Sequence, residues 1–382
     1  HEEMTTTQLP GVQHLIDRIH QEIDEKRDSY QLRSTVPYME LMARYFERTV
    51  RAKQEGKHLV AHTTQLPVEI FYAMDVVPFF IETYCLFLNF FEDFQVGHVF
   101  HHAVPRTVTE GDSAIYIALT GDRRPLHCAR EFAQSLGFQR EVVHYMLVFH
   151  IVFGRAVPDV SLNSPANLGY ADVRFLQTVY PGDTLRAETE VIGKRETSRG
   201  DVGIVWVHTK GFNQRDEPVL QFYRWVMVNK RDPGANSGAA DAPELPARGA
   251  VQNLHVPPEL DLSRFDPVAT GGQAFWEDYE PGERIVHPQG FTIEDAEHQS
   301  ATRLYQNNAR VHFNEMLLKK SRLGTLIIYC GHIISLAHSI SYDGLENAVR
   351  ILGFNAGSHA NPTVAGDTLF AWSDVLERID LG

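Results

Sequence analysis

The sequence has 382 residues, of which 43% are hydrophobic and 22% are charged, an ordinary globular mixture with enough apolar mass for two or three domains. Its formal net charge of −14 argues against a nucleic-acid partner, because binding phosphates requires a basic surface. The three cysteines, Cys85, Cys128 and Cys330, are dispersed and odd in number, so we expect no disulfide framework and a cytoplasmic protein.

Two amphipathic helical patterns open the chain. Their apolar positions are Ile16, Ile19 and Ile23 in the first, and Leu41, Tyr45 and Val50 in the second. Residues 57–80 then read as strand, loop, short helix and strand, which predicts a small α/β-like piece. No apolar run reaches the roughly 20 residues that a membrane-spanning helix needs, and the acidic N-terminus shows no signal peptide. We therefore expect no membrane partner.

Most of the remaining chain is an internal repeat. Residues 90–127 and 275–312 align without a gap, so that Phe90 pairs with Phe275 and His127 with His312. Gly-Asp-Thr-Leu recurs at 182–185 and 366–369, in nearly the same register. Two matches in one register indicate a duplicated fold.

Each copy reads alike along the chain. A first strand and turn lead to a helix, a loop with a histidine, an apolar helix and then strands that alternate with period two. The predicted helices are 110–120 and 146–157 in the first copy and 293–305 and 332–340 in the second; the clearest strands are 183–192, 202–209 and 218–229. One buried helix followed by long antiparallel strands predicts an α+β fold in which the sheet wraps around the helix.

These patterns divide the chain into four segments. They are an N-terminal extension (1–88), a first copy (89–231), a linker rich in Pro, Gly, Ala and Asp (232–272) and a second copy (273–382). The second copy stops before the counterparts of the last two strands of the first. We therefore expect it to be incomplete, with open sheet edges that favour a homo-oligomer.

The loop from Gly121 to His127 contains two candidate acid–base residues. It places the carboxylate of Asp122 and an imidazole on one short segment that Pro125 stiffens. Hydration of an α,β-unsaturated thioester needs one group that takes a proton from water and one that delivers a proton to Cα. A histidine beside an aspartate is more often a turn or cap residue than a catalyst, but its recurrence as His312 in the second copy favours chemistry.

The thioester oxygen becomes negative in the transition state and needs N–H donors, which a helix N-terminus supplies. The apolar helix of the second copy begins at Cys330-Gly331-His332, where Gly331 would let a thioester approach the backbone. Tyr145, at the helix start of the first copy, would not. Zinc-ligand spacing, a P-loop and GxGxxG are absent from the sequence, so we expect no metal and no nucleotide cofactor.

Gly121–His127 resembles the signature of the MaoC-type dehydratases and (R)-specific enoyl-CoA hydratases, and departs from it at Arg124, where asparagine is usual. Longer segments are similar to the mesaconyl-CoA hydratases, also called β-methylmalyl-CoA dehydratases. They include RTVTEGD (106–112), LVFHIVFGRAVPDVSLN (147–163), RWVMVNKRDP (224–233), ATRLYQNNARVHFN (301–314) and GHIISLA (331–337). The resemblance covers about 90–382. It implies a double hot-dog fold and the hydration of a branched C5 acyl-CoA, with no cofactor beyond the coenzyme A of the substrate.

Two assignments of the active site stay open. The resemblance implies that the second copy works, because such proteins keep the histidine of that copy, whereas the chemical argument favours the carboxylate–imidazole pair of the first. The candidate catalytic residues are His312, Asn307, Asp122 and His127, and the candidate substrate-binding residues are Gly331, His332, Arg310 and Pro125.

Residues 40–85 resemble the N-terminal part of a 2-hydroxyacyl-CoA dehydratase or benzoyl-CoA reductase subunit, whose iron–sulfur cluster needs several cysteines. This segment offers Cys85 alone, so no cluster is expected. Two other functions remain open for the repeat. A hot-dog thioesterase would hydrolyse the same thioester, and an inactive remnant would bind acyl-CoA without turning it over.

Overall fold

The computed structural model describes residues 13, 16–17, 19–21, 23–24, 35–57, 59–62, 77–80, 90–162, 164–234, 238–245, 249, 251–319, 321 and 323–381. The chain divides into two compact units, His1–Leu88 and Asn89–Gly382. Among the helices described, none is both long enough and apolar enough to cross a membrane.

The first unit contains helix α2 (Thr35–Gln54) and the parallel strands β1 (Leu59–His62) and β2 (Val77–Phe80). Its apolar cluster joins the three isoleucines of the preceding helical segment to Ala43, Phe46 and Val50. The predicted apolar face of α2 is wrong at Leu41, which is 63% exposed, because the buried positions follow the spacing 43, 46, 50. The short helix expected between β1 and β2 lies outside the described residues.

The first copy of the repeat follows the predicted order. Its elements are η1 (Phe91–Asp93), β3 (Val99–His101), β4 (Arg106–Thr107), α5 (Glu110–Thr120), α6 (Pro125–Cys128), α7 (Arg130–Ser135), α8 (Tyr145–Val160), β5 (Ala166–Phe175), β6 (Thr184–Glu196), β7 (Val202–Phe212) and β8 (Pro218–Asn229). Thr109 and Asp112 form a capping box that starts α5, and Gly121 ends it with a left-handed φ of 68°.

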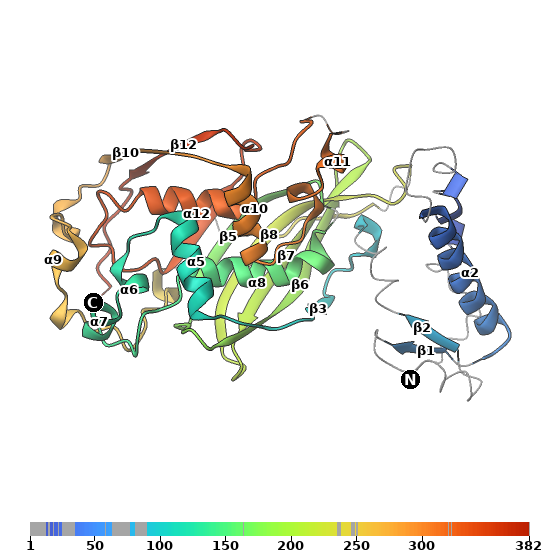
Figure 1. Ribbon diagram of the computed structural model, residues 1–382, viewed down its shortest axis with the longest axis horizontal. Helices are drawn as coiled ribbons and strands as arrows, with labels where there is room; N and C mark the ends of the chain where they lie inside the picture. Colours follow the sequence, from blue (N-terminus) through green and yellow to red (C-terminus); the bar gives the residue numbers. More distant parts are fainter. Residues whose placement is uncertain are drawn as a thin grey trace. The chain divides into compact units, whose positions relative to one another are not determined.

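An antiparallel sheet wraps around α8. Its strand order is β11-β5-β8-β7-β6-β3, and β4 and β9 (Ala240–Asp241) pair with β6. Alternate residues of β7 and β8, such as Val205 and Val226, are buried against Ala156 and Val160 of α8. Figure 1 shows α8 running across these strands. The predicted α+β arrangement is confirmed.

The second copy repeats this scheme with fewer strands. Its elements are η4 (Trp276–Asp278), β10 (Arg284–Thr292), α10 (Asp295–Leu304), η5 (Arg310–His312), α11 (Glu315–Leu318), α12 (Cys330–Ile340), β11 (Gly353–Ser358) and β12 (Thr368–Asp374). β11 joins the edge of the first copy's sheet beside β5, while β12 pairs with β10. Both β10 and β12 contact α12, which lies alongside α5 (Figure 1).

Two segments contain structure beyond the sequence-based expectation. The Phe-x-Glu-Asp motif that opens each copy forms a short 3₁₀ helix, because the side chains of Asp93 and Asp278 accept the backbone N–H groups of Phe90 and Phe275; the first strand of each copy follows it as β3 or β10. The linker is more structured than its composition indicates. Besides β9, it contains η2 (Val251–Asn253), η3 (Leu262–Arg264) and α9 (Pro267–Thr270).

Candidate active site

The two loop histidines are held by the same hydrogen bond. His127 Nδ1 lies 3.0 Å from the carbonyl oxygen of Val142, and His312 Nδ1 lies 2.8 Å from that of Ile327. A carbonyl oxygen only accepts, so Nδ1 carries the hydrogen and Nε2 is left as the basic nitrogen. Burial lowers the pKa of His312 to about 4, and burial with the neighbouring charge of His144 lowers the pKa of His127 well below its usual value. Both imidazoles are therefore neutral bases at pH 7.

The residue five positions before each histidine is also held alike. Asp122 Oδ1 accepts the backbone N–H of Arg124 at 2.9 Å, and Asn307 Oδ1 accepts that of Ala309 at 3.0 Å. This shared backbone turn does not use the second carboxylate oxygen in the first copy or the amide Nδ2 in the second. The loops are thus equivalent in backbone and different in chemistry.

In the first copy that oxygen is already occupied. Arg124, which is 3% exposed, forms a buried ion pair with Asp122 Oδ2 and also donates to the backbone oxygen of His338 at 3.1 Å. Burial alone would raise the pKa of Asp122, but His144 and Arg124 lower it far below its usual range. Asp122 therefore stays ionised and neutralised, which suits neither a general acid nor a strong base.

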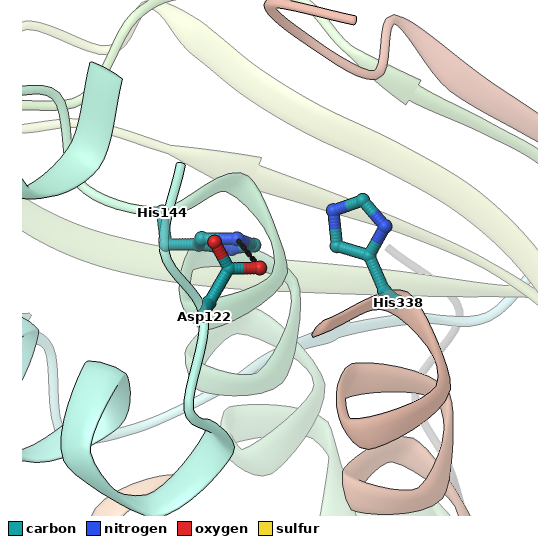
Figure 2. A group of neighbouring side chains, drawn as sticks. All are labelled: Asp122, His144 and His338. Carbon is teal, nitrogen blue, oxygen red and sulfur yellow. Dashed lines mark ion pairs between the residues drawn. The ribbon is translucent and has the colours of Figure 1, made fainter. Parts of the chain in front are cut away.

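Asp122, His144 and His338 form the group with the most metal-like geometry in the described part of the chain, with ligand atoms within 4.8 Å of one another (Figure 2). His144 Nε2 lies 3.4 Å from Asp122 Oδ2 without a hydrogen bond, but the other nitrogen of His144 and Nε2 of His338 have protein partners. His144 Nδ1 accepts the Met146 N–H at 3.1 Å, and His338 Nε2 bonds the hydroxyl of Tyr145. A cation here would also face the guanidinium on Asp122. The group fits a hydrogen-bonded junction between the copies better than a metal site.

Among the described residues of the first copy, the space beside His127 is too small for an acyl chain. His127 Nε2 is buried without a hydrogen-bond partner, and the void beside it measures about 10 Å³. Tyr145, Phe175 and Arg350 close this void, which is about the size that holds a single water molecule. This enclosure disfavours Asp122 and His127 as the catalytic pair.

At the equivalent place in the second copy, beside His312, lies a cavity of about 520 Å³, and part of its wall comes from α8 and β5 of the first copy. Its wall is mainly apolar, as in most small-molecule sites. Its lining includes Phe153, Ser161, Asn307, His312, Tyr329 and Cys330. Val142 and Ile327, which anchor the two histidines, extend the register of the repeat and make Cys330 the counterpart of Tyr145, so a small side chain stands where a phenol fills the first copy. That substitution opens the cavity beside His312.

The predicted substrate-binding residues lie elsewhere. A Cβ on Gly331 would come within 2.4 Å of the Tyr329 ring, so this glycine admits that ring and is not part of the cavity wall. His332 is buried, bonds Glu297 Oε1 at 2.8 Å and does not line the cavity. Arg310 is exposed on η5, and Pro125 is buried at the start of α6.

Of the eight candidates, the structure brings Asn307 and His312 to the cavity. Sequence reasoning missed Cys330, although comparing it with Tyr145 in the alignment of the copies would have found it. The backbone N–H groups of the first turn of α12 have no acceptor within that helix, and Cys330 is its first residue. The cavity therefore combines a basic imidazole, an amide and a helix N-terminus.

Most of the chain is similar to proteins of known activity. Residues 87–381 match the family model of mesaconyl-CoA hydratase. Over 291 residues the chain is 52% identical to a β-methylmalyl-CoA dehydratase of Chloroflexus aurantiacus, covering 76% of this chain and 83% of that protein. Over 292 residues it is 48% identical to a mesaconyl-CoA hydratase of Cereibacter sphaeroides, covering 76% and 84%.

Solved structures confirm the predicted double hot-dog fold. A MaoC domain protein dehydratase from Chloroflexus aurantiacus superposes with a TM-score of 0.74 at 52% identity, covering 76% of this chain and 83% of that one. A double hot-dog protein from Mycobacterium tuberculosis superposes with a TM-score of 0.62 at 25% identity, covering 74% and 84%. By sequence and by fold, the chain belongs to the mesaconyl-CoA hydratase family.

Proposed function

We propose that the chain catalyses the reversible hydration of mesaconyl-CoA to β-methylmalyl-CoA, or of a closely related branched enoyl-CoA. The observation that carries this is the cavity of about 520 Å³ in which His312 and Asn307 meet the N-terminus of α12. The names of two curated relatives supply the substrate.

One base performs both proton transfers in this mechanism. His312 Nε2 takes a proton from water while the water oxygen bonds to Cβ, and the imidazolium then returns that proton to Cα. Asn307 cannot exchange a proton, but its Nδ2 can hold the oxygen of the water or of the product hydroxyl. Because the same imidazole serves both steps, hydroxyl and hydrogen add to the same face of the double bond.

The helix N-terminus stabilises the intermediate charge. As water attacks Cβ, negative charge moves to the thioester oxygen. The backbone N–H groups of the first turn of α12, together with its helix dipole, favour an anion there. Imidazole, amide and helix end thus supply all the groups the reaction needs, so we propose no cofactor beyond the coenzyme A of the substrate.

We also propose that the enzyme works in the cytoplasm as a homo-oligomer. The dispersed cysteines support the location, and the single pairing partner of β12 among the described strands supports the oligomer.

Mesaconyl-CoA tests the activity directly. We expect the enoyl absorbance to fall with no release of free thiol. Thiol release at the same rate would identify a thioesterase instead. No change in either signal would leave an acyl-CoA-binding protein and overturn the proposal.

A further inference from the structure

Arg224 is a buried cation that lacks an anionic partner in the described structure. It lies on β8 with 0% exposure. Its Nη1 donates to Ser161 Oγ at 3.3 Å, while Nε and Nη2 are buried with no hydrogen-bond partner. The guanidinium carbon lies 4.3 Å from the centre of the Phe153 ring, which covers one face of the group.

Such a charge is costly unless something pairs with it. A buried ion without a partner loses its hydration and gains nothing in return. Arg124, which is also buried, shows the usual solution, since Asp122 neutralises it. Burial lowers the pKa of Arg224 to about 10, so it remains charged at pH 7. The residues that act on its charge are Tyr170, Tyr329 and Cys330, all neutral at that pH.

The guanidinium lies directly behind the wall of the candidate active site. Phe153 and Ser161, the two side chains it contacts, both line the cavity. The ring centre of Tyr329 is 5.5 Å from that of Phe153 and 5.7 Å from that of His312. The cation therefore stands behind the same stretch of wall that borders the catalytic imidazole.

We propose that Arg224, acting through the hydroxyl of Ser161, holds a carboxylate at the end of the acyl group and so selects dicarboxylic acyl-CoA substrates. Ser161 Oγ accepts from Arg224, which leaves its own hydrogen free to donate into the cavity. Hydrogen bonds that involve an ionised group are about twice as strong as neutral ones, so this relay favours an anion over a methyl group. The inference rests on the proposed function and adds to it a positioning residue.

The test compares two substrates that differ at one group. Mesaconyl-CoA carries a carboxylate where 2-methylcrotonyl-CoA carries a methyl group. In the full chain, Arg224→Met should lower kcat/KM for mesaconyl-CoA by roughly ten- to a hundred-fold, mainly by raising KM. The kcat/KM for 2-methylcrotonyl-CoA should stay unchanged or rise. Arg224→Lys should retain part of the preference. Ser161→Ala should also reduce the substrate ratio, which is kcat/KM for mesaconyl-CoA divided by kcat/KM for 2-methylcrotonyl-CoA. If Arg224→Met fails to fold, the result for Ser161→Ala tests the inference.

A structural role would give a different pattern. Removing an unpaired buried charge should leave the melting temperature of Arg224→Met equal to or above that of the wild type. The matched control, Arg124→Met, strands the carboxylate of Asp122 and should lower the melting temperature without changing the substrate ratio. Equal losses on both substrates in Arg224→Met and Ser161→Ala would overturn the inference alone. Failure of the wild type to hydrate mesaconyl-CoA would overturn the proposed function.

Discussion

Loop histidines with identical anchors have unequal access to a ligand. His127 and His312 bond equivalent carbonyl oxygens, but the first is sealed behind Tyr145 and the second lines the cavity. We therefore expect His312→Ala to reduce kcat for hydration by roughly 10²–10⁴-fold, the usual size of a general acid–base contribution. His127→Ala should change kcat far less and act mainly on stability. Steady-state kinetics of both variants checks this, and the reverse order would return catalysis to the first copy.

The lowered pKa of His312 predicts how the stability and the activity of the protein change at acidic pH. Its folded-state pKa of about 4 lies below the usual value of 6.5, so the folded protein binds this proton less readily than the unfolded chain. The stability that the neutral imidazole contributes is complete above pH 6.5 and is lost as the pH falls toward 4. The acid limb of kcat/KM should likewise lie well below pH 6.5. A pH–rate profile and urea unfolding at pH 5 and 7 measure both effects; an acid limb centred at 6.5 would contradict the burial of this base.

At the scale of single elements, the start of α12 decides which copy is open. Cys330 stands where α8 begins with Tyr145, whose phenol bonds His338 and fills the site of the first copy. Cys330→Tyr should therefore close the cavity and abolish measurable turnover while the protein still folds. Cys330→Ser, which keeps the side chain small, is the control and should retain most of the activity. Acyl-CoA binding by calorimetry provides the second readout, and full binding by Cys330→Tyr would count against this account.

The limits of helices were predictable from the sequence where neighbouring residues determine them. The helix at 110–120 was predicted with the correct ends, since a capping box and a left-handed glycine define both. α8 extends beyond its predicted limits, to Tyr145 and Val160, because tertiary packing buries residues that a window of hydrophobicity leaves out. The cavity and the surroundings of Arg224 were not predictable. They depend on which side chains of the two copies meet, and a single sequence shows this only where the repeats are compared residue by residue.

In the molecule as a whole, the two units have separate hydrophobic cores. The cluster around Phe46 uses residues before position 51 alone, whereas the clusters around Phe149 and Phe91 begin after position 90. Each unit thus has its own core. We expect deletion of residues 1–88 to leave the rest folded, with cooperative unfolding and unchanged kcat. Circular dichroism with urea titration measures this. Loss of a cooperative transition would show that the first unit contributes to the core of the second.

Self-association is the remaining prediction. Among the described strands β12 pairs with β10 alone, which leaves its other edge without a hydrogen-bonding strand. An edge of this kind recruits further strands, and Phe370 on β12 adds an apolar side chain that is 65% exposed. We expect sedimentation velocity to show a concentration-dependent oligomer that Phe370→Lys weakens. Leu262→Lys, at a linker position that is 56% exposed, should not change it. A monomer at every concentration would show that the edge of β12 is protected in solution, and the proposed homo-oligomer would then be wrong.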